Sequence, residues 1–169
     1  MNSQLKNRAA SIDGIVFDVD GVLTDGRIVY SDDGSELKQF HVQDGASIKL
    51  LMQHNIHVGI ITGRQSTMVE RRARELGINW VKQGVGNKAE ALTTMLAEGF
   101  SAEGIAVVGD DLQDLTLFEH PRVLLNMTVA NAHPAVLERA HFITSRAGGE
   151  GVAVEICQLL LMAQDKWEY

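Results

Sequence analysis

The sequence predicts an α/β fold with a mostly parallel sheet between helices. Short apolar runs rich in β-branched residues alternate with helical patterns along the whole chain, and each run closes on polar or glycine residues. The chain has 169 residues, of which 45% are hydrophobic and 22% are charged. This length and composition predict a single domain over residues 1–169.

The apolar runs predict buried parallel strands, at residues 14–19, 56–61, 105–109 and 122–126, with a further strand around 79–82. Helical patterns lie between and after them, at residues 45–54, 66–76, 88–98, 112–119, 132–139 and 152–164. In folds of this kind the functional groups collect at the carboxyl ends of the strands. We therefore expect the polar motifs that follow the strands to converge.

One segment interrupts the alternation. Residues 27–31 and 36–42 form two extended stretches around the turn sequence DDGS. This pattern predicts a β-hairpin inserted after the first strand, at about residues 27–42.

Composition excludes some partners. The formal net charge is -7 and the sequence pI is about 5.3, so we expect no nucleic-acid partner and no attachment to a membrane. The first ten residues are polar and lack a signal-like apolar stretch, which favours a cytoplasmic protein. Cys157 is the only cysteine, and its place on an apolar helical pattern predicts packing and not chemistry.

The first motif is VFDVDGVLTDG at residues 16–26, where Asp18, Asp20 and Asp25 crowd the end of an apolar run. Burying Asp18 and Asp20 as charges requires a cation or hydrogen bonds. Gly21 permits a turn that would expose them instead, so a pair of solvent-facing acids stays open on this motif alone.

A second strand end reads ITGR. Thr62, Gly63 and Arg64 offer a hydroxyl, a flexible N–H and a guanidinium, a set that can bind phosphate oxygens. The alternative is that Thr62 is simply the N-cap of the following helix.

A third motif is NK, in which Lys88 begins a helix. A cation is unfavourable at that end of the helix dipole unless an anion lies close. A solvated surface lysine is the alternative.

The fourth motif, GDDLQD, places Asp110, Asp111 and Asp114 after another strand. Two strand ends loaded with carboxylates would repel unless a hard cation lies between them, and oxygen ligands suit Mg²⁺. The sequence therefore predicts a magnesium site.

These four motifs in this order resemble the haloacid dehalogenase superfamily of phosphohydrolases, and the resemblance covers nearly the whole chain. It implies a Rossmann-like sheet and hydrolysis through an aspartyl-phosphate. By this resemblance Asp18 is the nucleophile and Asp20 the general acid and base. Thr62 and Lys88 hold the phosphoryl oxygens, the metal ligands are Asp18, Asp20 and Asp110, and Asp111 and Asp114 support them from outside.

No separate cap domain fits between these motifs, so a capless enzyme is expected. The segments GSELKQFHVQDG, NAHP and AGGEGVAVEIC extend the resemblance to the superfamily's sugar-acid phosphatases. These are capless homotetramers that use Mg²⁺ and release 3-deoxy-D-manno-octulosonate (KDO) from its 8-phosphate, in lipopolysaccharide synthesis. In them the hairpins of the subunits associate.

The same likeness implies a sugar-acid pocket. Besides the catalytic groups it is lined by Gly63, Arg64 and Arg72, with the loop residues His41, Val42, Gln43, Asp44 and Gly45. Arg64 and Arg72 are eight residues apart, so we expect them on one side of one helix. Alternatively Arg72 belongs to a solvated basic run, and His41 is a satisfied structural residue.

The chain departs from the pattern of these enzymes at Gln43, Glu150 and Val154, where arginines are frequent. A related nine-carbon sugar-acid phosphate is therefore a rival substrate. A non-catalytic module with this fold is a rival from another class, against which the intact Asp18 and Lys88 argue.

Overall fold

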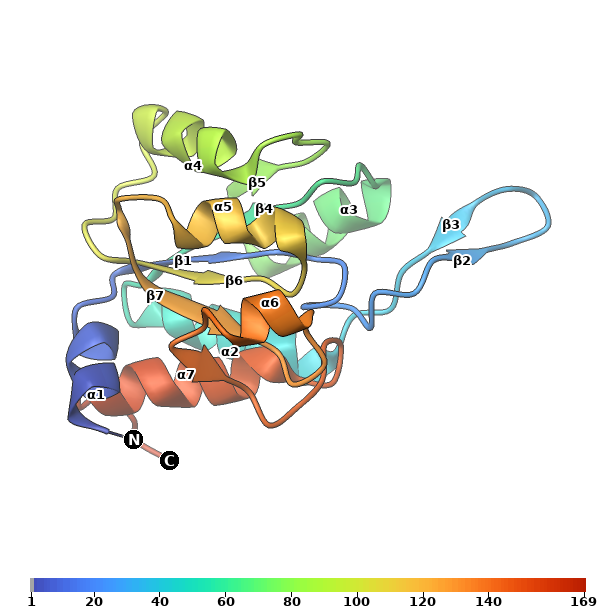
Figure 1. Cartoon of the computed structure of the whole chain (residues 1–169). Coiled ribbons are helices and arrows are strands. Elements are labelled where there is room, and N and C mark those ends of the chain that lie inside the picture. Colours follow the sequence, from blue (N-terminus) through green and yellow to red (C-terminus); the bar gives the residue numbers. More distant parts are fainter. Residues whose placement is uncertain (1) are drawn as a thin grey trace.

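The computed structural model describes residues 2–169 and contains a six-stranded parallel sheet, as the sequence predicts (Figure 1). The strand order is β5-β4-β1-β6-β7-β8. The strands are β1 (Gly14–Phe17), β4 (His57–Ile61), β5 (Trp80–Lys82), β6 (Ile105–Val108), β7 (Val123–Thr128) and β8 (Phe142–Ile143).

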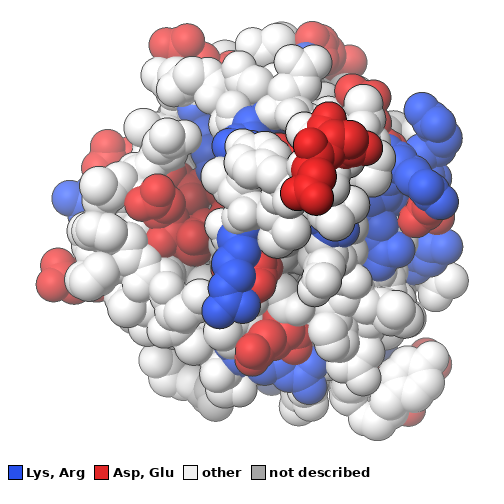
Figure 2. All heavy atoms as spheres, turned by 90° about the vertical axis from the view of Figure 1, so that its right-hand side faces the viewer, with Lys and Arg blue, Asp and Glu red and all other residues white. Residues whose placement is uncertain are grey.

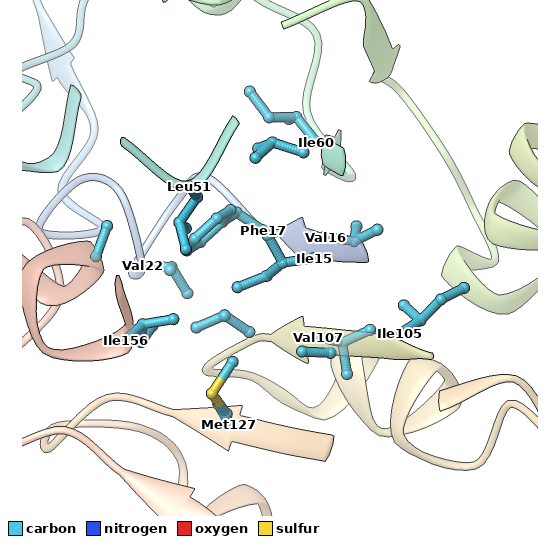
Figure 3. Close-up of a cluster of buried hydrophobic side chains, with 14 of the residues drawn as sticks. Ile15, Val16, Phe17, Val22, Leu51, Ile60, Ile105, Val107, Met127 and Ile156 are labelled. Carbon is cyan, nitrogen blue, oxygen red and sulfur yellow. The ribbon is translucent and has the colours of Figure 1, made fainter. Parts of the chain in front are cut away.

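The central strand β1 lies between β4 and β6, so the chain leaves it to one side and later returns to the other. All four residues of β1 are buried, because helices cover both faces of the sheet. Ile15 and Phe17 point to one face and Val16 to the other, within the cluster of buried side chains in Figure 3. This reversal of strand order beside β1 creates a crevice at the carboxyl ends of the strands.

Helices form a layer on each side of the sheet (Figure 1). On one side α1 (Ser3–Ala10), α2 (Val42–Gln53) and α7 (Val152–Ala163) pack together, with α3 (Thr67–Leu76) beside α2. On the other side α4 (Lys88–Ala97) packs against α5 (Leu115–Phe118). Two shorter helices, η1 (Leu112–Asp114) and α6 (Pro134–Leu137), complete the connections.

The predicted hairpin is present as β2 (Val29–Tyr30) and β3 (Glu36–Leu37), paired antiparallel in a small sheet of their own. It projects away from the main body (Figure 1). Its paired part is shorter than the predicted stretches of residues 27–31 and 36–42. Figure 2 looks onto the side from which it projects, where basic and acidic side chains are interspersed.

Some elements differ from the prediction. The polar first ten residues contain α1, where Asn2 caps the helix and Ala9 is buried. Helix α2 begins at Val42, three residues earlier than expected, because His41 acts as its N-cap. The short strand β8 has no periodic pattern to predict it.

Cys157 is buried in α7 and free, as its apolar surroundings predict. Burial raises the pKa of its thiol to about 11, which makes it a packing residue. Within residues 2–169 we find no helix with the length and apolar character needed to cross a bilayer.

Candidate active site

The carboxyl ends of three neighbouring strands bring the predicted motifs together. Asp18 follows β1, Thr62 follows β4, and Asp110 comes two residues after β6. The backbone N–H of Asp18 donates to the Val108 carbonyl at 2.9 Å, which continues the pairing of β1 with β6 by one residue. All three side chains line one cavity, whose other walls include Asp20, Gly63, Arg64, Lys88 and Asp111.

The chain turns sharply after Asp18. Three successive backbone N–H groups, of residues 22–24, donate to the Val19 carbonyl. Gly21 has a φ of +93°, and a Cβ at this position would overlap the Asp110 carboxylate. Glycine is therefore required here both by the backbone conformation and by the close approach of Asp110.

Lys88 is buried, so the alternative of a solvated surface lysine is wrong. Asn87 caps α4 and places Lys88 in its first turn. The Lys88 Nζ lies 2.8 Å from Asp18 Oδ2 and 2.5 Å from Asp114 Oδ1. The anions expected near this lysine are thus the carboxylates of two other motifs.

Asp114 is also buried and holds both Lys88 and the loop after β6. Its Oδ2 accepts the backbone N–H groups of Asp110 (3.0 Å) and Asp111 (3.1 Å). Asp111 is exposed and caps η1 through its own side chain. Asp114 thus contacts Lys88 as expected, whereas Asp111 shapes the loop.

The burial of this cluster changes its protonation. Burial and the nearby Asp114 raise the pKa of Asp18 to about 6, although Lys88 opposes the shift. Burial and the charges of Asp18 and Asp114 raise the pKa of Asp110 to about 7. A further positive charge beside the two carboxyls would favour their ionised forms.

The donor set fits a divalent cation. One carboxylate oxygen from each of Asp18, Asp110 and Asp114 lies within 4.8 Å of the others. Asp110 Oδ1 is buried and has no hydrogen-bond partner in the part of the chain that the structure describes. A buried carboxylate oxygen that has no hydrogen-bond partner and lies beside other carboxylate oxygens is suited to bind Mg²⁺.

The Asp20 carboxylate lies outside that cluster and joins a network at the base of the hairpin. Its Oδ1 pairs with Lys38, and Lys38 also pairs with Glu36 at 2.9 Å. Sequence reasoning missed Lys38 and Glu36, because the hairpin shows only an extended pattern. Their alternation with the exposed Leu37 is the signal that places both on the face opposite to it.

Thr62 does not cap the following helix. Ser66 is the N-cap of α3, and Thr62 is buried at the cavity with Gly63 beside it. The structure therefore removes the capping alternative for Thr62. A hydroxyl and a backbone N–H remain at the strand end, as expected of an anion site.

The expectation that Arg64 and Arg72 share one helix is wrong. Arg64 lies in the loop before α3, because the helix begins only at Thr67. Arg64 Nη2 lies 2.7 Å from Glu36 at the cavity. Arg72 lies on α3, where its Nη2 donates to the His41 carbonyl at 3.3 Å.

The predicted pocket loop lies apart from the cavity around Asp18. His41 caps α2, Val42 is 80% exposed, and Asp44 Oδ1 accepts the backbone N–H of Ala153 at 2.7 Å. Gln43 Oε1 accepts a hydrogen bond from Arg146 Nη1 at 3.3 Å. Sequence reasoning did not single out this arginine. Within one chain, His41, Asp44, Gly45 and Arg72 line a small separate cavity, whereas Val42 and Gln43 do not.

Comparisons with known proteins bear on these observations. Residues 80–156 match a family model described as haloacid dehalogenase-like hydrolase. The chain is 42% identical to the 3-deoxy-D-manno-octulosonate 8-phosphate phosphatase KdsC of Salmonella typhi, over 98% of this chain and 88% of that protein.

Solved structures agree. The 3-deoxy-D-manno-octulosonate 8-phosphate phosphatase from Yersinia pestis superposes with a TM-score of 0.91 at 40% identity, over 98% of this chain and 89% of that one. The enzyme of that name from Moraxella catarrhalis was solved with a magnesium ion, a phosphate ion and KDO, and it also superposes with a TM-score of 0.91. It is 38% identical over 98% of this chain and 94% of that chain.

Proposed function

The chain belongs to the 3-deoxy-D-manno-octulosonate 8-phosphate phosphatase family of haloacid dehalogenase-like hydrolases, and we propose that it hydrolyses KDO 8-phosphate to KDO and phosphate in lipopolysaccharide biosynthesis. One observation supports this activity most directly. A buried carboxylate, Asp18, follows the central strand and contacts a buried lysine, Lys88, inside a cavity with a hydroxyl and a guanidinium in its walls.

In the first step an oxygen of the Asp18 carboxylate bonds to phosphorus as the bond from phosphorus to the sugar oxygen breaks. Asp20 gives its proton to that sugar oxygen, so KDO leaves as an alcohol. Thr62 and Lys88 bind the phosphoryl oxygens, on which negative charge is spread during the transfer.

In the second step water attacks the phosphorus of the aspartyl-phosphate. Asp20, now a carboxylate, takes a proton from this water, and the Asp18 carboxylate is released together with phosphate. Asp18 and Asp20 thus return to their starting protonation states. Asp114 maintains Lys88 in place through both steps.

Asp18 and Asp110 would hold Mg²⁺ through their carboxylates, and Asp20, the third predicted ligand, would contribute its backbone carbonyl oxygen, because its carboxylate serves in proton transfer. When bound, the ion neutralises charge between the carboxylate and the substrate phosphate. The magnesium and phosphate ions in the Moraxella catarrhalis enzyme support this assignment. Both carboxylate oxygens of Asp114 are already engaged, by Lys88 and by two backbone N–H groups, so Asp114, like Asp111, would act from outside the ligand set.

We further propose a homotetramer in which the hairpins of the subunits meet. The hairpin exposes apolar side chains to an unusual degree: Ile28 is 49%, Tyr30 64% and Leu37 54% exposed. Such surface on a projecting arm fits contact with another copy of the chain. In this assembly the loop around His41 and Arg72 would face a neighbouring subunit's substrate. A single-domain chain and a cytoplasmic location complete the proposal.

A substrate panel tests this function. We expect rapid phosphate release from KDO 8-phosphate with Mg²⁺ and much slower release from a nine-carbon sugar-acid 9-phosphate. A clear preference for the nine-carbon ester would replace the substrate while leaving the chemistry intact. Release from neither, with the fold intact, would contradict the proposed function.

A further inference from the structure

We propose that Lys38, on the hairpin, is a positioning residue that orients the Asp20 carboxylate for proton transfer, an inference that rests on the proposed phosphatase function. Lys38 directly follows β3, eighteen residues after Asp20 in the sequence. The structure brings its Nζ onto Asp20 Oδ1.

The burial of Lys38 supports a specific role. Its side chain is only 2% exposed, although it lies on a projecting hairpin. Burial lowers the pKa of Lys38, but the hydrogen bonds with Asp20 and Glu36 outweigh that effect and raise it. Lys38 is therefore a charged group held at a fixed place, and not a flexible surface side chain.

Glu36 keeps this arrangement intact when Asp20 gains or loses a proton. It pairs with Lys38 at 2.9 Å and with Arg64 at 2.7 Å. Hydrogen bonds from these two residues lower the pKa of Glu36. Lys38 thus retains one carboxylate partner in both halves of the reaction, so it is not left as an unpaired buried charge.

The contact also distinguishes the two oxygens of Asp20. Lys38 has only donors to offer, so the oxygen that it contacts, Oδ1, must act as an acceptor. Asp20 Oδ2 is buried and has no hydrogen-bond partner among residues 2–169, with Arg64 Nε 4.0 Å away. Oδ2 is therefore the oxygen that is left free to face the sugar oxygen.

The strand geometry explains how a hairpin reaches the site. Leu37 is 54% exposed, whereas its neighbours Glu36 and Lys38 point to the opposite face and contact Arg64 and Asp20. Successive side chains of an extended segment alternate between two faces. One face of this segment therefore carries exposed apolar surface, and the other contacts the general acid.

Leaving-group dependence tests the proposal. The sugar oxygen of KDO must receive a proton to leave, whereas 4-nitrophenyl phosphate releases a stable phenolate that needs none. For Lys38→Met we expect kcat on KDO 8-phosphate to fall by about tenfold to a hundredfold, with little change in KM. On 4-nitrophenyl phosphate we expect a much smaller loss, and Lys38→Arg should recover part of the activity on the sugar phosphate.

The matched control is Lys82→Met, which removes a lysine paired with Glu98 at 2.7 Å away from the cavity. It should leave both activities unchanged, and light scattering should show the same assembly for every variant. If Lys38→Met does not fold, Lys38→Gln provides the same comparison. Equal losses on both substrates, or no loss on either, would overturn the role of Lys38. Failure of the wild-type enzyme on KDO 8-phosphate would instead reject the proposed function.

Discussion

The Lys88 Nζ lies 2.8 Å from Asp18 Oδ2, and both side chains are almost fully buried, at 4% and 8% exposed. Lys88 also contacts Asp114 Oδ1 at 2.5 Å. One cation therefore serves two buried carboxylates, one that follows the central strand and one in the fourth motif. The charge of the site depends on all three residues together.

Removing this cation should damage both stability and activity. For Lys88→Met we expect a loss of about 3–5 kcal/mol in the free energy of unfolding, because two buried carboxylates lose their partner. Phosphate release should fall to background, since the phosphoryl oxygens also lose a ligand. Urea unfolding and phosphate assays measure the two effects. Lys82→Met is the control, and a Lys88→Met enzyme with normal turnover would refute the assignment.

Asp114 should contribute to phosphate release indirectly, because it holds Lys88 and the loop after β6 in place. Asp114→Asn keeps the size of the side chain but removes the charge that faces Lys88. We expect phosphate release to fall by about tenfold to a hundredfold, as for other groups that orient a catalytic or metal-binding side chain. Steady-state kinetics at saturating Mg²⁺ give this value. An Asp114→Asn variant as active as the wild type would show that Lys88 does not need this support.

The raised pKa values predict how stability depends on pH. Asp18 and Asp110 have pKa values of about 6 and about 7 in the folded protein, against a reference of 3.8. Between about pH 4 and pH 7 the folded protein therefore holds protons that the unfolded chain has released. Their contribution to the stability of the metal-free protein should fall as the pH rises through this window.

Magnesium should reverse that trend, because it binds the deprotonated carboxylates. We expect Mg²⁺ to raise the Tm more at about pH 8 than at about pH 5. Asp110→Asn should abolish most of this difference. An equal shift in Tm at both pH values would contradict a metal site built from these carboxylates.

Dissociation of the oligomer should lower the activity on the sugar phosphate more than the activity on a small aryl phosphate. Tyr30→Asp places a charge on the exposed apolar part of the hairpin and should dissociate the oligomer. We expect the dissociated chain to lose more activity on KDO 8-phosphate than on 4-nitrophenyl phosphate, because only the sugar needs a wall from a neighbour. Light scattering confirms the state of assembly. Equal losses on the two substrates would count against closure of the site by another subunit.

The sequence was most informative where periodicity and chemistry coincide. Asp18, Thr62 and Asp110 each follow an apolar run, and the rule that parallel strands end at one edge was enough to bring them together. A cation at the start of a helix is unfavourable unless an anion lies close, and this rule correctly indicated that Lys88 has anionic neighbours. These inferences depend on local patterns and on one rule of topology.

Other features depend on contacts that no local pattern carries. Arg64 and Arg72 have helical spacing, but the cap at Ser66 starts α3 after Arg64 and separates them. The link from Asp20 to Lys38 requires the hairpin to fold back onto the site. Asp44 lies in a predicted binding loop, yet its carboxylate accepts the backbone N–H of Ala153 at the start of α7. Each of these contacts is set by tertiary structure.

The most direct measurement is phosphate release from KDO 8-phosphate with Mg²⁺ by the wild-type chain and by Asp18→Asn. The substitution keeps the side-chain shape but replaces the attacking carboxylate by an amide. We predict that turnover is abolished while circular dichroism and the state of assembly remain those of the wild type. A correctly folded Asp18→Asn enzyme that still releases phosphate at the wild-type rate would contradict the account.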